Sequence, residues 1–501
     1  MKKSFFALVL CLMVLISSCA ASVDQNPTSS SKEPAQDSVE TVLPPSDKPP
    51  AGDGSLSADP APDAPDSSAD ASASGADDGA SAEPPPAEDA GAVPSPAEPG
   101  STYTPVFQQI APNGIPAVCI ATAPDTVITR DEYIDCAIAV VDPTGTYDKV
   151  SDVNCTIKVR GNSTSRGEKK PYNFKFSSKQ ELLGLGKGKK WALLSNMYDK
   201  TQLRNLLSFN FAHDIGMDYV QQSTFVEVYL NGEYRGIYQL CEPVDVDKTK
   251  VDIDEDGNEA LLEIEPRAGY SNDHWITSPR YKLLLGFNAP EDPTDEQRAY
   301  YKEFLGKAEK AMASGDYAEL CKYVDVQSFA NAYIVQELFK QVDYITSSTR
   351  FYIKGDKLYE GPVWDFDLSS GNCSSQYYPE YNNKGTTGLS WQGLHCVGLW
   401  NQYLFRFEEF RQLVSDRLIE LQPIITNLYE DNELGRSRID AWLDQYREDI
   451  DRNNEIWSTS VKYNAYEHTP VDGTYDGEIE FLRDWLKNRN QWLVDYYCTA
   501  T

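Results

Sequence analysis

The sequence of 501 residues predicts an α+β fold, in which a strand-rich part holding one helix precedes a helix-rich part. Between about residues 115 and 265, apolar residues form short or alternating runs, which are typical of strands. After about residue 293 they recur at helical spacing. The globular part, 105–501, is long enough for one large bilobal domain or for two domains that share a cleft, and we place the boundary between the two lobes near residue 245.

The chain opens with a segment typical of protein export. Lys2 and Lys3 precede an apolar run, 5–16, that is short for a membrane-spanning helix. The run ends Ile-Ser-Ser-Cys, which looks like a bacterial lipobox with Cys19 as the lipid-modified first residue of the mature protein. We expect a lipoprotein signal peptide, 1–19, and an extracytoplasmic protein held at the cell membrane only by its N-terminal lipid. The alternative is an ordinary secretory signal cleaved nearby, with Cys19 unmodified.

Residues 20–104 are rich in Ala, Ser, Pro, Asp and Gly. Their apolar surface is too small to offset the conformational entropy lost on folding, and their acidic side chains repel one another. We therefore predict a disordered, extended tether. The formal net charge of the chain is −32, part of which this segment carries, and such an acidic balance argues against nucleic acid as a partner.

The first lobe is predicted to consist of strands around one helix. Short apolar or alternating runs predict strands, in chain order, at 118–121, 137–141, 155–160, 172–176 and 191–195. A helical period follows over 200–215, where Gly216 is a plausible C-cap. The runs 225–230 and 235–240 flank Asn231-Gly232, a pair that strongly favours a two-residue hairpin turn.

The second lobe is predicted to be mainly helical, with one further strand, 261–265, at its beginning. Helical spacing predicts helices at 294–313, 326–341, 406–428, 436–450 and 477–497. A small extended pair, 349–353 and 358–363, interrupts them. The sequence Trp-Asp-Phe-Asp follows this pair directly.

In that sequence two acids alternate with two aromatic residues. On an extended chain Asp365 and Asp367 point to one side, and Trp364 and Phe366 point to the other. Two carboxylates on one side suit a divalent cation held by oxygen ligands. They also suit an acidic turn that only caps the next element. We expect the two aromatic side chains to anchor the segment in the core.

Eight cysteines lie between residues 119 and 498. Their even number and an exported location permit disulfide bonds. Their spacings are wide and include no C-x-x-C, so a zinc site is not indicated. The sequence leaves two alternatives open: one or two disulfide bonds, or a set of scattered buried thiols.

Four spaced motifs carry a resemblance to a known family. They are Arg-Gly-Asn-Ser-Thr-Ser with the following Lys-Lys-Pro-Tyr-Asn-Phe-Lys-Phe (160–176), Trp-Ala-Leu-Leu-Ser-Asn to Arg-Asn (191–205), Val-Tyr-Leu-Asn-Gly to Cys-Glu (228–242), and Trp-Asp-Phe-Asp (364–367). In this order they resemble the CotH (spore coat protein H) kinase family over roughly residues 115–375. The resemblance implies an atypical protein-kinase-like bilobal fold and phosphorylation of Ser residues in secreted or surface proteins, with ATP and Mg²⁺.

The resemblance also implies roles for individual residues. Asp343 would be the catalytic aspartate, whose carboxylate accepts the proton of the substrate hydroxyl. Asp365 and Asp367 would bind the metal. The residues expected to contact ATP are Arg160, Ser163, Lys170, Lys175 and Glu242. Asp199 is expected to favour the start of the helix after it, and Arg204 is expected either to pair with an acid in the cleft or to form a surface ion pair.

One position departs from the family pattern. The family often has an Asn, able to bind a second metal ion, where this chain has Arg350. This difference puts the second metal site in doubt. A catalytically inactive pseudokinase that binds surface proteins or the cell wall is the main alternative, because ATP is scarce outside the cell. A carbohydrate-active enzyme that uses paired carboxylates is a lesser one.

Overall fold

The structure is a computed structural model that describes residues 114–264, 274–344, 347–374, 385–390 and 400–498. All described residues belong to one compact unit. The expected signal peptide, Cys19 and the expected tether lie outside the described residues. Within the described ranges, no helix is both long and apolar enough to cross a membrane.

Seven strands form a closed barrel in the order β1-β2-β3-β4-β5-β7-β6. In chain order they are β1 (Ala117–Ala121), β2 (Ile134–Val141), β3 (Val150–Val159), β4 (Tyr172–Glu181), β5 (Lys187–Leu194), β6 (Ser223–Leu230) and β7 (Glu233–Cys241). The parallel pair β1–β6 closes the barrel, and the other neighbours are antiparallel. The prediction of a strand-rich first part is confirmed, but closure, which removes both sheet edges, was not predicted.

Alternating side chains fill the barrel. On β4, Tyr172, Phe174 and Phe176 are buried, while the residues between them are partly exposed. They pack with Trp191 and other apolar residues into one hydrophobic cluster. The period of two seen in the sequence therefore separates the interior of the barrel from its outer wall.

The predicted hairpin turn is confirmed between β6 and β7. Asn231 and Gly232 have φ values of 51° and 82°, the left-handed conformation that a two-residue turn of this type requires. Leu230 pairs with Glu233 across the turn. The Asn231 side chain also donates to Thr122 Oγ1 at 3.0 Å, which ties the turn to the end of β1.

Helix α2 (Arg204–Asp214) lies between β5 and β6 in the chain. Its predicted end is confirmed, because Gly216 has a φ of 79° and donates its N–H to the His213 carbonyl at 2.9 Å. Its start is four residues later than predicted. Asp199 accepts hydrogen bonds from Thr201 N at 3.0 Å and from Arg204 N at 2.8 Å, so the preceding residues form a turn.

A second sheet has five strands in the order β12-β11-β8-β10-β9. They are β8 (Ala260–Ile264), β9 (Trp275–Thr277), β10 (Leu284–Ala289), β11 (Arg350–Lys354) and β12 (Lys357–Glu360). The expected extended pair, 349–353 and 358–363, is confirmed as β11 and β12 and forms one edge of this sheet, because β11 also pairs with β8. The sequence shows no sign of that pairing, since the two strands lie far apart in the chain.

The second part is mainly helical, as predicted. Its helices are α4 (Asp295–Met312), α5 (Tyr317–Tyr323), α6 (Val326–Phe339), α7 (Asn401–Leu404), α8 (Glu408–Glu420), α9 (Gln422–Asn427), α10 (Arg438–Ile456) and α11 (Tyr475–Cys498). The prediction of a single helix over 406–428 is wrong, because this segment forms two helices, α8 and α9. Pro423 in the first turn of α9 has no N–H to continue the hydrogen bonds of α8.

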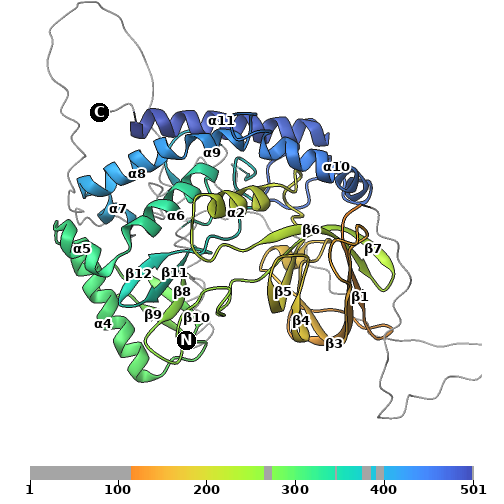
Figure 1. Cartoon of the computed structure of the whole chain (residues 1–501), viewed down its shortest axis with the longest axis horizontal. Coiled ribbons are helices and arrows are strands. Elements are labelled where there is room, and N and C mark those ends of the chain that lie inside the picture. Colours follow the sequence, from red (N-terminus) through yellow and green to blue (C-terminus); the bar gives the residue numbers. More distant parts are fainter. Residues whose placement is uncertain (1–113, 265–273, 345–346, 375–384, 391–399, 499–501) are drawn as a thin grey trace, which may run out of the picture. The chain divides into compact units, whose positions relative to one another are not determined.

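Helix α10 joins the helical part to the barrel, against β7 (Figure 1). Asn453 Oδ1 accepts from the Ile237 N–H at 3.2 Å and from Lys169 Nζ at 3.0 Å. Trp457 Nε1 donates to the Arg235 carbonyl at 2.9 Å.

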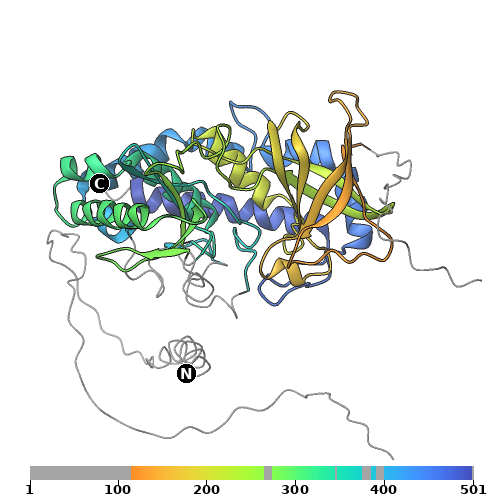
Figure 2. The same cartoon turned by 90° about the horizontal axis from the view of Figure 1, so that it is seen from below.

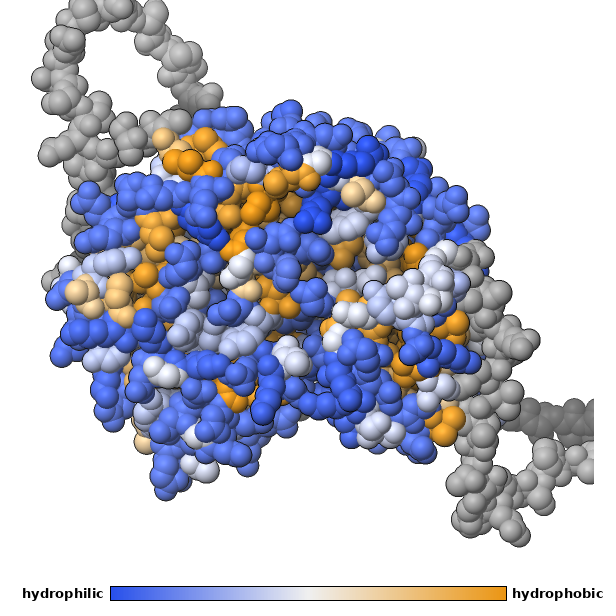
Figure 3. All heavy atoms as spheres, viewed as in Figure 1, coloured by the Kyte–Doolittle hydropathy of each residue, from blue (hydrophilic) through white to orange (hydrophobic). Residues whose placement is uncertain are grey.

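The five-stranded sheet and α4 lie at the other end of the unit, away from the barrel (Figure 2). On the face shown in Figure 3 the surface is hollowed between this sheet and the barrel.

Candidate active site

The Trp-Asp-Phe-Asp segment follows β12 and is anchored by its aromatic side chains. Trp364 stacks on Phe209 of α2 with ring centres 5.5 Å apart, and Phe366 packs edge-on against Phe339 of α6. Both aromatic side chains are buried, which confirms that they anchor the segment in the core. Asp365 has a φ of 73°, so the backbone turns sharply there.

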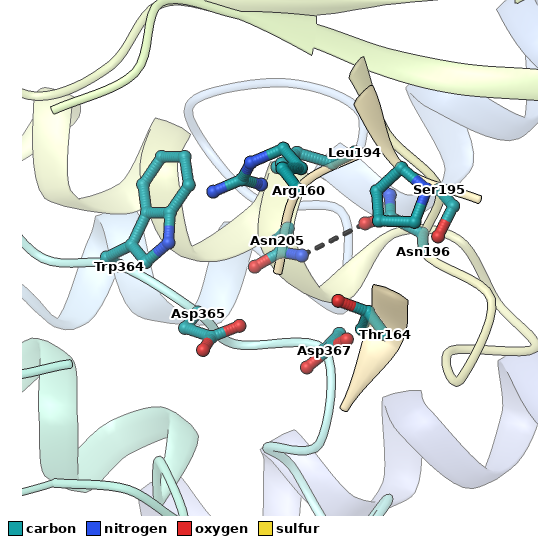
Figure 4. Close-up of a pocket in the computed structure, with 10 residues that line it drawn as sticks. Arg160, Thr164, Leu194, Ser195, Asn196, Asn205, Trp364, Asp365 and Asp367 are labelled. Carbon is teal, nitrogen blue, oxygen red and sulfur yellow. Dashed lines mark hydrogen bonds between the residues drawn. The ribbon is translucent and has the colours of Figure 1, made fainter. Parts of the chain in front are cut away.

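The two acids of this segment line a pocket between the barrel and α2 (Figure 4). Its free space is about 340 Å³, counted together with the solvent at its mouth. The lining residues come from the ends of β3 and β5, the turn after β3, α2 and the acidic segment: Arg160, Thr164, Pro171, Leu194, Ser195, Asn196, Asn205, Trp364, Asp365 and Asp367. Residues from three of the four sequence motifs therefore meet in one place.

Asn205 of α2 fixes the acidic segment in position. Its Oδ1 accepts from the Phe366 backbone N–H at 2.7 Å. Its Nδ2 donates to Asn196 Oδ1 at 3.0 Å, the dashed line in Figure 4. Asn196 in turn donates to Gln239 Oε1 of β7 at 3.1 Å. This chain of amides connects the barrel, α2 and the acids.

Arg160 brings a positive charge into the pocket. Its guanidinium carbon lies 5.1 Å from the centre of the Trp364 ring, and Figure 4 shows the group across from Asp365. Its Nε is buried and has no hydrogen-bond partner among the described residues. Burial lowers the pKa of Arg160, and Asp365 and Asp367 oppose this effect. A partly exposed guanidinium with an unused donor is well suited to bind an anion.

Asp367 lies in a strongly acidic environment. Asp367 is only 9% exposed. Burial raises its pKa well above the usual range, and Asp365, Asp199 and Asp343 raise it further. When several carboxylates lie close together in a buried site, they cannot all be ionised unless a cation compensates their charge. The pocket therefore favours a bound cation next to Asp365 and Asp367.

The donor set fits Mg²⁺ better than a metal that needs a complete protein cage. In the described part of the chain, no three His, Cys, Asp or Glu side chains are grouped closely enough to hold a metal ion. Mg²⁺ is commonly bound by one or two carboxylates, with water and phosphate oxygens completing its coordination. Asp365 and Asp367 match that arrangement.

A comparison with protein families identifies the chain. The family described as CotH kinase protein matches residues 157–493, and this match includes all four motifs. The chain belongs to the CotH kinase family. No curated protein matches it.

Asp343 of this CotH family member lies in the turn after α6. Lys340 ends that helix with a φ of 52°, and the Asp343 carbonyl accepts from the Ser347 N–H at 2.9 Å. Its charge acts on Asp367, so the structure brings it into the electrostatic environment of the pocket without placing it in the lining.

Three of the expected phosphate-binding residues do not line this pocket. Ser163 uses its carbonyl to accept from Tyr198 Oη at 3.0 Å, and its neighbour Thr164 faces the pocket instead. Lys170 Nζ donates to the Ser165 carbonyl at 2.9 Å. Lys175 lies on the barrel wall, with Nζ 4.0 Å from the centre of the Tyr133 ring.

Glu242 is also outside the first pocket and lines a second one, just beyond the end of β7. It is 8% exposed, and its Oε1 lies 3.5 Å from Lys250 Nζ. Burial raises the pKa of Glu242, and Lys250 partly offsets that rise.

Arg350 is engaged with neighbouring protein groups. Its side chain is 10% exposed and forms an ion pair of 3.0 Å with Glu263. Its guanidinium carbon lies 5.8 Å from the centre of the Trp364 ring, and its Nε is buried without a hydrogen-bond partner among the described residues. A guanidinium has no oxygen and cannot bind a metal ion as an Asn side chain can.

The question about Arg204 is resolved by a buried ion pair with Asp199, in which NH1 lies 2.5 Å from Oδ1. The Arg204 Nε also donates to the Ser369 carbonyl at 3.0 Å. The pair is therefore not on the surface, and it connects the start of α2 to the chain that follows the acids. Asp199 accepts from the Arg204 N–H, in keeping with its expected role at the helix start.

Sequence reasoning missed Thr164, Ser195, Asn196 and Asn205 as pocket residues. Thr164 lies inside the first motif, 160–176, and the other three lie inside the second, 191–205, so membership of a motif is the signal that could have identified all four. Among the described residues no two cysteines form a disulfide bond with each other, which favours the scattered-thiol alternative for them. Cys396 lies outside the described residues.

Proposed function

We propose that this protein is an atypical kinase that transfers the γ-phosphate of ATP to serine residues of secreted or surface proteins. The observation that carries the proposal is the pocket in which Asp365 and Asp367 meet the guanidinium of Arg160. Phosphoryl transfer needs both kinds of group, since acids hold the metal and cations compensate the phosphate charge. Membership of the CotH kinase family supports this reaction class.

In this proposal Asp365 and Asp367 hold Mg²⁺, and Arg160 binds phosphate oxygens from the barrel side. The metal ion, when bound, neutralises negative charge on the phosphates. Lys170, Lys175 and Ser163 remain candidates for the rest of the triphosphate. Ser163 and Lys170 lie with Arg160 in the connection between β3 and β4, and Lys175 lies on β4, all three outside the pocket itself.

Asp343 is the proposed acceptor of the hydroxyl proton. The substrate serine Oγ forms a bond to the γ-phosphorus, the bond between that phosphorus and the β–γ bridging oxygen breaks, and ADP leaves. The proton of the serine hydroxyl passes to the Asp343 carboxylate. The position of Asp343 in the electrostatic environment of Asp367 supports this assignment.

We also propose a kinase-like bilobal arrangement, in which the barrel takes the place of the strand lobe. The protein would be exported and held at the membrane by a lipid on Cys19, with secreted or surface proteins as substrates and no nucleic acid partner. The export signal in the sequence supports this location.

A second candidate function is that of a pseudokinase, which binds a nucleotide or a surface partner without transferring phosphate. The ion pair of Arg350 with Glu263 favours it, because this side chain cannot provide a second metal site. The glycosidase alternative is not favoured by the pocket. Its two acids lie two positions apart on one segment, whereas glycosidases place their acids on both sides of the sugar bond.

Calorimetric titration of the full chain with ATP, with and without Mg²⁺, tests the proposed site. We expect Mg²⁺-dependent binding that weakens at least about tenfold, or 1.4 kcal/mol, in Asp365→Asn. Asn tolerates the positive φ of this position, so the substitution should leave the backbone intact. Asp131→Asn, at an exposed position in the connection between β1 and β2, is the matched control. Equal binding by both variants would refute the assignment of Asp365.

A further inference from the structure

The Asp365 carboxylate is hydrogen-bonded to a residue that lies outside all four sequence motifs. Ser348 is in the connection between α6 and β11, and its Oγ donates to Asp365 Oδ2 at 3.2 Å. The two residues lie on either side of the β11–β12 hairpin in the chain. The hydrogen bond therefore joins the connection that carries Asp343 to the acidic segment of the pocket.

Both residues of this hydrogen bond have a left-handed backbone. The φ of Ser348 is 54°, and the φ of Asp365 is 73°. Aspartate adopts this conformation more readily than most residues do, but for serine it is uncommon. Residues held in sparsely populated backbone conformations gather at functional sites, because the surrounding structure keeps them where the chemistry needs them. A hydrogen bond between the side chains of two such residues points to an arrangement built for a function.

The backbone on both sides of Ser348 is tied to neighbouring segments. Before it, the Ser347 N–H donates to the Asp343 carbonyl at 2.9 Å. After it, the Thr349 carbonyl accepts from the Ile264 N–H at 2.8 Å, at the end of β8. Because these two hydrogen bonds leave the chain little freedom between them, they fix the direction in which the Ser348 side chain points.

Asp365 is also held at its backbone by the same connection. Gln341 lies two residues before Asp343, and its Nε2 donates to the Asp365 carbonyl at 3.0 Å and to the Trp364 carbonyl at 3.3 Å. Gln341 therefore holds the backbone of Asp365, and Ser348 holds one oxygen of its carboxylate. The other oxygen, Oδ1, accepts no hydrogen bond from the described residues, which leaves it for a cation.

We propose that Ser348 is a positioning residue for Asp365, whose carboxylate it orients toward Mg²⁺ through the hydroxyl hydrogen bond. This inference rests on the proposed function. Hydrogen bonds that orient a metal ligand commonly contribute about tenfold or more to metal affinity. Because the same connection carries Asp343, it sets the positions of both the proposed proton acceptor and the metal-binding acid.

Calorimetric titration of the full chain with ATP tests this role through the factor by which Mg²⁺ tightens ATP binding. In Ser348→Gly we expect this factor to fall at least about threefold, because the donor that orients the carboxylate is lost. Glycine adopts the positive φ without strain, so ATP affinity without Mg²⁺ should stay unchanged. Ser348→Asn tolerates the same φ and has an amide donor, so it should restore most of the factor. Asp125→Gly, at an exposed position with a φ of 59°, should keep the wild-type factor.

A double variant tests whether Ser348 acts through Asp365. Adding Ser348→Gly to Asp365→Asn should lower the factor no further, because the carboxylate that the hydroxyl orients is already absent. A further fall as large as that in Ser348→Gly alone would overturn the positioning role.

The other outcomes separate this inference from the function on which it rests. A wild-type factor in Ser348→Gly would overturn the inference and leave the nucleotide site standing. An equal loss of ATP affinity with and without Mg²⁺ in that variant would overturn it too, because it would identify a purely structural residue. Wild-type protein that binds no ATP, or binds it equally well without Mg²⁺, would overturn the proposed function itself and this inference with it.

Discussion

Lys169 shows how a single buried charge connects the barrel to the helical part. The residue is 1% exposed, its Nζ donates to Asn453 Oδ1 at 3.0 Å, and the same atom lies 5.0 Å from the centre of the Tyr238 ring. Burial lowers the pKa of Lys169 to about 7. Its neighbour Lys170 points elsewhere, so the two lysines of the motif have different roles.

The pH dependence of folding tests this burial. Between pH 7 and about 10.5 Lys169 is neutral in the folded protein but protonated when unfolded, so the free energy of unfolding rises with pH by up to about 1.4 kcal/mol per unit. Below pH 7 both states carry the proton and this contribution is constant. Lys169→Met should lose the rise, as measured by urea unfolding at pH 7 and pH 9. Lys189→Met, at an exposed position, should keep it. An identical pH slope in Lys169→Met would contradict the assigned pKa.

For single residues, the chemical role of a side chain was easier to predict than the direction in which the side chain points. The alternation of acids and aromatics in Trp-Asp-Phe-Asp predicted that Asp365 and Asp367 face a site together, and both line the pocket. It did not predict that Trp364 lines the pocket as well, because the backbone turns at Asp365, where φ is 73°, and is not extended there. The choice between Ser163 and Thr164 depends on how a short turn is rotated, which a local pattern does not determine. The position of the Lys169 side chain depends on its hydrogen bond to Asn453, a residue 284 positions away in the chain.

Among the elements, α2 organises the candidate site through the buried pair of Asp199 and Arg204. Both side chains are fully buried, and Arg204 also bonds the carbonyl of Ser369 after the acidic segment. Removal of Arg204 would leave the Asp199 carboxylate buried without its partner.

We expect Arg204→Ala to lower the free energy of unfolding by about 3–5 kcal/mol, the usual cost of breaking a buried ion pair. Arg235→Ala, which breaks an exposed pair with Glu233, should cost about 1 kcal/mol or less. Urea unfolding of the two variants at pH 7 makes the comparison. Similar losses in both would show that the buried pair does not have this role.

Local signals were sufficient to predict the elements that local residues determine. Asn231-Gly232 predicted the hairpin, and Gly216 predicted the end of α2. The pairing of β11 with β8 joins segments on either side of three helices, and the closure of the barrel by β1 and β6 joins its first and sixth strands. Neither leaves a local pattern, because both depend on contacts between distant segments.

For the molecule as a whole, the sequence predicts an exported protein anchored through Cys19. Expression of the full chain in a bacterium that modifies lipoproteins should place it in the detergent phase of a Triton X-114 extraction. Cys19→Ser should shift it to the aqueous phase, because the anchoring lipid is lost. Recovery of the unmodified wild-type chain in the aqueous phase would support the alternative of an ordinary secretory signal.

The central claim is that the pocket of Asp365, Asp367 and Arg160 performs phosphoryl transfer, and mass spectrometry tests it most directly. The full chain is incubated with ATP, Mg²⁺ and a mixture of secreted and surface proteins, and phosphoserine is then measured on every protein present. We predict phosphoserine with the wild-type chain and with Asp131→Asn, and its loss with Asp365→Asn and with Asp343→Asn. Tight binding of Mg-ATP without phosphoserine on any protein would contradict the account and identify a pseudokinase.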